Sequence, residues 1–328
     1  MSIRVLNEAQ IRKAVTLEEA IAAMEKAFIA YSLKQASLPA VIHLDVPDQK
    51  GEVHIKAGYL FGEREYVVKI ASGFWENRKK DLPVSGGMML ACSSETGFPT
   101  AILLDNGYLT ELRTAAAGAV AAKYMASNSV EQVAVIGAGS QGRFQIEALA
   151  RVCSFDRIKV YDHRRSNLER YASEMKERVR AEIVGASTPE EALRGSRIVI
   201  TSTPSKIPIL FGDWVEPGTH ITAMGSDGVD KQELDISVLQ KADRIIADSI
   251  PQCLRLGEIH HAITAGVIKE SDIDGELGEV VSGHIPGRLS QKEITICDLT
   301  GVGVQDAAIA GLVVRKMLAS DIGIQIEL

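Results

Sequence analysis

The sequence lacks the features by which a membrane or secreted protein is usually recognised. No apolar run approaches the roughly 20 residues that a membrane-spanning helix requires, and the N-terminus has no apolar signal core. The four cysteines (Cys92, Cys153, Cys253 and Cys297) form no C-x-x-C pair. Such scattered cysteines are typical of reduced thiols, so we expect a cytoplasmic protein that has neither disulfides nor a zinc site. Because the chain has no long apolar run, we also expect no membrane partner.

The chain also lacks a dense stripe of lysine and arginine. Its 36 basic residues are outnumbered by 43 acidic ones, which gives a net charge of -7. We therefore expect no nucleic-acid partner, because an acidic surface repels the phosphate backbone. No internal repeat or low-complexity linker interrupts the 328 residues, a length that suits two domains.

What the chain does contain is a glycine-rich turn directly after the apolar run 133–136. Gly137, Gly139 and Gly142 have the G-x-G-x-x-G spacing, which predicts a strand, a tight turn and a helix whose N–H groups face a pyrophosphate. Asp162 follows a second apolar run at the distance expected of a ribose-binding acid. Together these residues predict a dinucleotide-binding domain; the alternative is a glycine turn in an α/β domain without a ligand.

The hydrophobic pattern differs between the two parts of the chain. From residue 39 the apolar residues alternate over closely spaced segments up to residue 104, which predicts an antiparallel or mixed sheet. From residue 131, strands alternate with helices, which predicts a parallel sheet. A capping box at 16–19 begins the first long helix, and we expect the last helix, 304–318, to pack on the first domain.

Residues directly after parallel strands are site candidates, because ligands bind beyond the carboxyl ends of such strands. Besides the three glycines and Asp162, these candidates are Ser140, Gln141, Thr203, Met224, Gly225 and Asp227.

The choice between NAD and NADP depends on residues next to Asp162. The carboxylate suits the ribose hydroxyls of NAD and would repel a 2′-phosphate, whereas the following His163, Arg164 and Arg165 could accept one. We favour NAD slightly and count Arg164 among the cofactor-binding candidates.

Three charged residues could carry chemistry. Asp227 lies in a turn, where a carboxylate can exchange a proton with a substrate nitrogen or simply cap the turn. Lys69 stands among apolar strand residues and either reaches solvent or faces a cavity that binds a carboxylate. Arg113 lies near the start of a helix that we expect Thr110 to cap. The helix dipole disfavours a cation there, so Arg113 is either exposed or held to reach an anion.

The histidines give weaker signals. His54 and Lys56 share one strand face, which is either solvated or part of an anion pocket. Adjacent residues such as His260 and His261 point about 100° apart on a helix, and no third ligand is evident. We therefore expect no metal site.

At this point the motifs resemble the ornithine cyclodeaminase/mu-crystallin family over nearly the full length. The segments that carry the resemblance are 68–73, 112–117, 135–142, 225–235, 286–288 and 303–306. The resemblance implies an α/β homodimer. It implies a Rossmann domain at 127–302, inserted in a smaller α+β domain at 1–126 and 303–328 that serves dimerisation and substrate binding.

The resemblance also implies roles for single residues. The residues matching Lys69 and Arg113 contact the substrate carboxylate and nearby cofactor groups. The aspartate matching Asp227 is the proton donor or acceptor, and the lysine matching Lys231 lies near the cofactor. We count Lys69 and Asp227 as catalytic.

Thr300 and Gly301 of the tail are further substrate-binding candidates. The other candidates depend on which substrate is bound. His54 and Lys56 would bind a second substrate carboxylate, whereas Asp45 or Asp298 would suit a basic side chain.

Two departures from the family pattern concern the substrate. Ala40 stands where many members have arginine, and Val84 stands where cyclodeaminases tend to have threonine. Other segments are more similar to the imine reductase subgroup, which includes iminosuccinate reductases. The leading hypothesis is an NAD(P)-dependent imine reductase or L-amino-acid dehydrogenase acting on a small amino or imino acid. The alternatives are an ornithine or lysine cyclodeaminase using catalytic NAD and a mu-crystallin-like ligand-binding protein.

Overall fold

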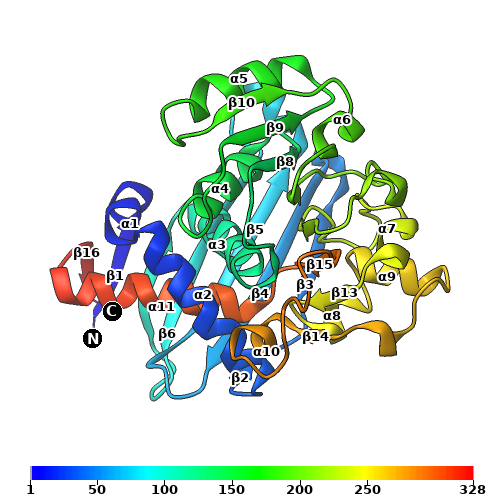
Figure 1. The fold of residues 1–328 in the computed structure, drawn as a ribbon. Helices are drawn as coiled ribbons and strands as arrows, with labels where there is room; N and C mark the ends of the chain where they lie inside the picture. The colour runs from blue at the N-terminus through cyan, green and yellow to red at the C-terminus, as the bar shows by residue number, and fades with distance from the viewer. Residues whose placement is uncertain (1, 328) are drawn as a thin grey trace. The chain divides into compact units, whose positions relative to one another are not determined.

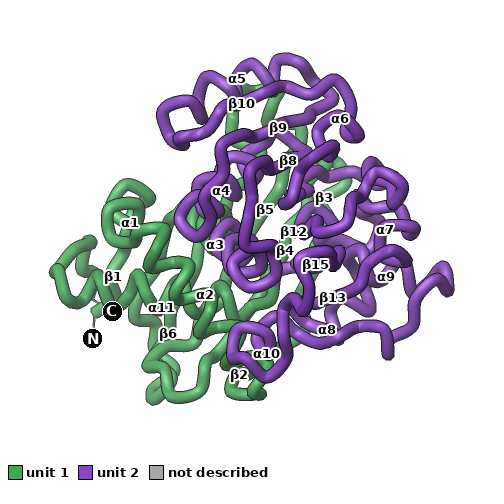
Figure 2. The backbone as a smooth tube through the Cα atoms, in the orientation of Figure 1, with its two compact units in different colours: residues 1–113, 302–328 green, residues 114–301 purple. Residues whose placement is uncertain are grey.

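The computed structural model describes residues 2–327 and divides into two compact units (Figure 2). Unit 1 comprises residues 1–113 and 302–328, and unit 2 comprises residues 114–301. The helix α3 (Tyr108–Met125) crosses the division, so the domain boundary expected at 126/127 lies at the end of this helix and the observed division lies within it. Within residues 2–327, no helix has the length and apolar character needed to cross a membrane.

Unit 1 is built on a mixed eight-stranded sheet, as its alternating pattern predicts (Figure 1). The strand order is β16-β1-β7-β6-β5-β4-β2, with β3 also paired to β4; β1 and β7 are parallel and the other pairs are antiparallel. The strands are β1 (Ser2–Asn7), β2 (Ala36–Ser37), β3 (Ile42–Val46), β4 (Gly51–Leu60), β5 (Glu65–Phe74), β6 (Ser85–Ser93), β7 (Pro99–Leu104) and β16 (Ile324–Glu327).

Helices cover one face of this sheet. They are α1 (Glu8–Ala14), α2 (Leu17–Ser32) and α11 (Gly303–Ser320), and α11 packs on β4, β5 and α2 (Figure 1). The predicted capping box of α2 is confirmed: Thr16 accepts from the Glu19 N–H at 3.3 Å, and Glu19 accepts from the Thr16 N–H at 3.1 Å. The prediction that the last helix packs on the first domain is also confirmed.

The predicted start of α3 at Thr110 is wrong. The helix begins at Tyr108, and the Asp105 carboxylate accepts from the Leu109 N–H at 2.8 Å. Asn106 and Gly107 adopt left-handed conformations, which turn the chain so that Asp105 reaches the helix start. Arg113 is consequently not in the first turn, where the helix dipole would oppose it most.

Unit 2 contains the predicted parallel sheet, with strand order β10-β9-β8-β11-β12-β15-β13-β14. Its strands are β8 (Gln132–Ile136), β9 (Arg157–Tyr161), β10 (Glu182–Gly185), β11 (Ile198–Thr201), β12 (His220–Ala223), β13 (Arg244–Ala247), β14 (Gly275–Glu276) and β15 (Thr295–Asp298). Its helices are α4 (Ser140–Leu149), α5 (Arg165–Met175), α6 (Pro189–Leu193), α7 (Ile236–Lys241), α8 (Ile250–Cys253), α9 (Glu258–Thr264) and α10 (Leu277–Val281).

Both faces of the parallel sheet are buried, which is why its strands read as continuous apolar runs. Val133 and Val135 of β8 point into one core, beside Tyr171 of α5. Ala134 and Ile136 point into the opposite core, beside Leu239 of α7. The carboxyl ends of β8, β9, β11 and β12 lie along one edge of the sheet, where the candidate cofactor residues follow.

Candidate functional site

The glycine-rich turn of unit 2 has the shape needed to receive a phosphate group. Gly137 has a φ of +109°, a backbone conformation that residues other than glycine rarely adopt. A Cβ at Gly142 would lie 2.1 Å from the Gly137 carbonyl oxygen, so only glycine permits this close approach. A Cβ at Gly139 would meet nothing within 4 Å, so that side of the turn is open. Because α4 begins here, its first N–H groups and its dipole favour an anion at the same place.

Asp162 follows β9 and holds the glycine turn in place. Its Oδ2 accepts from the Ala138 N–H at 3.0 Å, and its Oδ1 accepts from the Arg164 N–H and the Asn167 side-chain amide, each at 2.9 Å. A cavity of about 320 Å³ opens beside it. Gly137, Tyr161, Asp162, His163, Thr203, Pro204 and Ile207 are among the residues that line it. The structure therefore brings three of the predicted cofactor-binding residues, Gly137, Asp162 and Thr203, together around one cavity.

Two other predicted residues lie at the start of α4. Ser140 is exposed, and the Gln141 side chain accepts a hydrogen bond from the Gln145 amide at 3.1 Å. The Arg164 side chain is exposed and its Nε lies 3.1 Å from the His163 ring. Ser140 and Arg164 are thus exposed, whereas Gln141 is partly buried.

Glu233, to which the sequence assigned no role, joins two of the predicted strand ends. It is fully buried, and its two carboxylate oxygens accept from the Thr203 N–H at 2.5 Å and the Gly225 N–H at 2.9 Å. Thr203 follows β11, and Gly225 follows β12 and the buried Met224. Burial, the largest effect, raises the pKa of Glu233 to about 7.

Asp227 lies in the loop 225–233, whose ends are joined by the Glu233–Gly225 hydrogen bond. Its side chain is 53% exposed, and its Oδ1 accepts from Lys231 Nζ at 2.6 Å. The Lys231 carbonyl oxygen contacts the Ser226 hydroxyl and, at 2.8 Å, the His261 ring. The loop is thus fixed at its base, and its Asp227 carboxylate is exposed.

A chain of buried carboxylates anchors this loop to the sheet. Glu258, the first residue of α9, accepts from the N–H groups of Glu233 and Leu234 at 2.8 and 3.0 Å. Asp298, at the end of β15, accepts from the Ile259 N–H at 2.9 Å. Burial, followed by the charge of Asp248, raises the pKa of Asp298 to about 8 although backbone N–H groups lower it. The Asp298 carboxylate therefore binds the start of α9.

Thr300 and Gly301, predicted to bind substrate, contact a further buried carboxylate. The Thr300 hydroxyl donates to Asp248 Oδ1 at 2.8 Å, and the Gly301 N–H donates to Asp248 Oδ2 at 2.6 Å. The Gln252 side-chain amide donates to the Thr300 hydroxyl at 2.9 Å. These bonds give both residues a structural role in unit 2.

In unit 1, Lys69 and Arg113 meet on a single carboxylate. Lys69 Nζ and Arg113 Nε donate to Asp306 Oδ1 at 2.9 and 2.7 Å, and Arg113 Nη1 donates to Gln305 Oε1 at 2.9 Å. All four residues are at least 94% buried. The structure thus excludes the solvent-exposed alternative for Lys69 and Arg113, because both side chains are buried and donate to Asp306.

The pKa values in this cluster reflect competing effects. Burial, followed by the charge of Arg113, lowers the pKa of Lys69 to about 7, although Asp306 partly raises it. Burial alone would raise the pKa of Asp306, but Arg113 and Lys69 lower it by more, so the carboxylate stays ionised. The cluster therefore holds a lysine that can lose its proton near neutral pH.

Lys56 and His54 lie on the same sheet face as Lys69. Lys56 is directly opposite Lys69 in the β4–β5 pair, and His54 follows two residues away. The His54 ring packs edge-on against His43 of β3, with ring centroids 4.6 Å apart, and its Nε2 lies 3.9 Å from Glu52. Lys56 thus extends the cationic cluster, whereas His54 has an acidic neighbour.

The adjacent histidines His260 and His261 each contact a backbone carbonyl oxygen. His260 contacts the Leu254 carbonyl oxygen at 3.2 Å, and His261 contacts that of Lys231. Among residues 2–327, no three histidine, cysteine or acidic side chains are placed to hold a metal ion. The four cysteines are unpaired.

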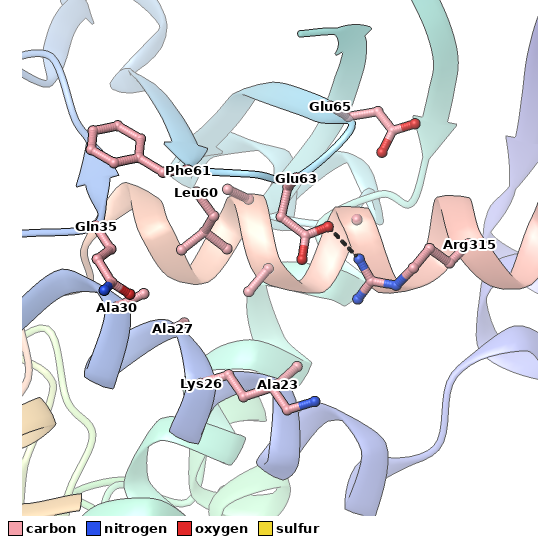
Figure 3. A pocket seen from close by; sticks show the side chains of 13 residues that line it. Ala23, Lys26, Ala27, Ala30, Gln35, Leu60, Phe61, Glu63, Glu65 and Arg315 are labelled. Atoms are coloured by element: carbon pink, nitrogen blue, oxygen red, sulfur yellow. Dashed lines mark hydrogen bonds and ion pairs between the residues drawn. The ribbon is translucent and has the colours of Figure 1, made fainter. Parts of the chain in front are cut away.

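A cavity of about 150 Å³ in unit 1 lies between α2, α11 and the β4–β5 turn (Figure 3). Its lining combines small residues of the two helices, including Ala27 of α2 and Gly311 of α11, with charged side chains. Among the latter, Arg315 pairs with Glu63 at 2.8 Å (Figure 3). None of the described residues around it is a predicted site residue. The cavity is therefore separate from the charged cluster.

Sequence reasoning gave no role to Asp306, Gln305, Glu233 and Glu258. Asp306 and Glu233 lie in segments that carry the family resemblance, which was the available signal. Acidic residues near helix starts are common because the dipole favours them there, so Asp306 and Glu258 looked ordinary. Only the three-dimensional contacts show that each carboxylate binds a distant segment.

The two sheets and these sites define a two-unit α/β protein whose parallel sheet carries a Rossmann-type glycine turn. The model of the ornithine cyclodeaminase/mu-crystallin family matches residues 2–321. The chain belongs to this family, so the resemblance inferred from its motifs is confirmed.

Two relatives match the chain over nearly its whole length. An uncharacterised cyclodeaminase of Sinorhizobium fredii is 43% identical over 317 residues, with 96% of each chain covered. The iminosuccinate reductase of Paracoccus denitrificans is 34% identical over 331 residues, with 99% of each covered.

Solved structures share the complete fold. The Δ1-pyrroline-2-carboxylate reductase of Thermococcus litoralis, in complex with NADH and L-proline, has a TM-score of 0.94 at 32% identity, with 99% of this chain and 100% of that chain covered. An archaeal alanine dehydrogenase dimer with bound NAD has a TM-score of 0.93 at 36% identity, with both chains fully covered. The predicted α/β fold class is confirmed.

Proposed function

We propose that this protein is an NAD-dependent imine reductase or L-amino-acid dehydrogenase. It would interconvert a small α-imino or cyclic imino acid and an L-amino acid. The observation that carries this proposal is the buried Lys69–Arg113 pair, because two cations withdrawn from water favour a bound carboxylate. The reductases and the dehydrogenase among the similar proteins support the reaction type.

The cofactor would be held by unit 2. The open glycine turn, the start of α4 and the cavity beside Asp162 fit a dinucleotide, and NAD suits the carboxylate of Asp162 better than NADP. When bound, the nicotinamide supplies or accepts the hydride. Thr203, Met224 and Gly225 at the strand ends, with Ser140, Gln141 and Lys231, would complete its binding site.

The chain's own residues would bind the substrate and move its proton. Lys69 and Arg113 would hold the α-carboxylate. Asp227 would give a proton to the substrate nitrogen in the reductive direction, and its hydrogen bond to Lys231 would keep the carboxylate oriented. Lys56 is the candidate for binding a second substrate carboxylate, with His54 beside it.

We further propose a homodimer formed through the sheet face of unit 1 that α11 does not cover. Ile42, Ile55, Ile70 and Met88 stand opposite one another in a row across β3, β4, β5 and β6. Ile42, Ile70 and Met88 are each at least 38% exposed. A contiguous exposed apolar row of this kind marks an interaction surface, and the similar alanine dehydrogenase is a dimer.

The first test follows nicotinamide absorbance with a panel of substrates. The panel contains cyclic imino acids, and keto acids mixed with ammonia, which form the open-chain imino acids in solution. We expect net NADH consumption by the wild type. Asp227→Asn should lower kcat about 100- to 10,000-fold, the usual contribution of a general acid, while leaving the Kd for NADH nearly unchanged. Its exposed side chain makes a folding defect unexpected.

Asp230→Asn is the matched control, because Asp230 lies in the same loop, is exposed and pairs with Lys206 at 3.5 Å. It should retain wild-type turnover. Full turnover by the Asp227 variant would reject the assignment of the proton donor.

A cyclodeaminase is the second candidate function, favoured by the 43% identity to the uncharacterised cyclodeaminase of Sinorhizobium fredii. It would release ammonia from ornithine or lysine without net change in NADH. That result, with no reduction of any imine, would replace the leading proposal.

A further inference from the structure

Asp306 connects the two cations of unit 1. It lies in the first turn of α11 and is 1% exposed. Its Oδ1 accepts from Lys69 Nζ and Arg113 Nε, from two separate elements, β5 and α3. Its Oδ2 is buried and has no hydrogen-bond partner among the described residues. The side-chain hydrogen bonds of Asp306 therefore come from these two cations.

The contacts of α11 also fix the plane of the Arg113 guanidinium. Nε donates to Asp306 at 2.7 Å and Nη1 donates to the neighbouring Gln305 at 2.9 Å, so consecutive residues of one helix hold two donors of the guanidinium. Gln305 is itself held, because its Oε1 accepts from the Val302 N–H at 3.0 Å. Two donors fixed on a rigid helix leave the guanidinium little freedom to rotate.

Charged residues of several elements surround Lys69 and influence its protonation. Lys56 of β4 and Arg113 of α3 oppose its positive charge, whereas Asp306 of α11 and Asp105, just before α3, favour it. Of these two carboxylates, only Asp306 makes a hydrogen bond with Lys69. The protonated state of Lys69 at neutral pH therefore depends most directly on Asp306.

We propose that Asp306 is a positioning residue that keeps Lys69 protonated and fixes Arg113, so that both cations bind the substrate carboxylate. This inference rests on the proposed function, in which Lys69 and Arg113 are the carboxylate ligands. Asp306 itself, being buried, acts through them.

The pH dependence has a definite sign. Lys69 is charged below its pKa of about 7, so carboxylate binding should be strongest there and weaken as the pH rises through that value. An opposite charge in contact shifts a pKa by about 1 to 3 units. Removing the charge of Asp306 should therefore move the pH at which binding is lost downward by about 1 to 3 units.

The experiment measures binding, so it does not depend on turnover. Isothermal titration calorimetry would follow pyrrole-2-carboxylate, a planar carboxylate that accepts no hydride, binding to the NAD-loaded enzyme from acid to alkaline pH. Asp306→Asn keeps the size of the side chain and removes its charge. Asp306→Ser, which leaves space for a water molecule, is the second neutral variant should the first not fold.

Gln305→Leu is the matched control. Gln305 holds Arg113 but has no hydrogen bond with Lys69, and its replacement changes no charge. It should weaken carboxylate binding and lower the melting temperature without moving the pH midpoint of binding. A purely structural role for Asp306 would give its variants the same behaviour.

Binding midpoints shifted downward in the folded Asp306 variant, but not in Gln305→Leu, would support the inference. An unshifted midpoint in that variant, or no carboxylate binding by the wild type at any pH, would overturn it. The proposed reaction is judged separately, by whether the wild type consumes NADH with an imino acid.

Discussion

At Asp162, one carboxylate has two tasks. Three hydrogen bonds tie it to Ala138, Arg164 and Asn167, which stabilises the glycine turn. The same carboxylate lines the cavity proposed for the nucleotide. A substitution of Asp162 should therefore affect both the choice between NAD and NADP and the stability of the glycine turn.

We expect the wild type to bind NADH more tightly than NADPH. Asp162→Ser should move the ratio of the two dissociation constants toward NADPH by about tenfold, or about 1.4 kcal/mol, because a negative charge no longer faces the 2′-phosphate. Fluorescence titration with both reduced cofactors measures this ratio. Wild-type binding that is tenfold tighter for NADPH would contradict the proposal of NAD.

Glu169→Ser is the control for that change of charge. Glu169 is an exposed residue of α5 that pairs with Arg165 at 3.2 Å and lies outside the cavity. Its replacement removes the same charge and should leave the ratio unchanged.

At the scale of the element, α11 has two glycines that differ in how much room a side chain would have. Gly303 begins the helix, where a Cβ would lie 2.5 Å from the Ala57 carbonyl oxygen. Gly311 faces the cavity of Figure 3, where a Cβ would meet only Arg315 Nη1, at 3.4 Å. The first glycine is required by packing against β4, whereas the second weakens the helix for no evident structural reason.

Gly311→Ala should therefore stabilise the protein by roughly 0.5–1 kcal/mol, the usual gain of alanine over glycine within a helix. Urea unfolding followed by circular dichroism measures the change. Gly303→Ala, in the same helix, should instead destabilise by about 1–3 kcal/mol because its Cβ has no room. Equal effects of the two substitutions would show that the cavity does not admit the extra methyl group.

For the whole molecule, the apolar row on the uncovered sheet face predicts the state of assembly. Ile70→Lys places a charge in the middle of that row and should convert the dimer to a monomer, because a lysine is costly to bury in an apolar interface. Analytical ultracentrifugation measures the mass. Leu318→Lys, at an exposed position of α11, should remain dimeric. A monomeric wild type would exclude this interface.

Much of the local structure could be predicted from the sequence. The capping box of α2, the strand–glycine–helix unit and the two types of sheet follow from short patterns, because caps, turns and alternation depend on neighbours in the chain. The start of α3 could not be predicted from Thr110, since Asp105 and the left-handed Asn106–Gly107 turn together set it.

The sequence by itself determined the fold class, the glycine turn with Asp162 and the family, because these depend on the spacing of residues within short motifs. Only the tertiary structure decided whether Lys69 is exposed or buried. Its partner Asp306 lies 237 residues away in the sequence. Whether a lysine on a strand reaches water or stays buried depends on which distant helix covers that strand. The packing of α11 on β5 settles that question and places Lys69 beside Arg113.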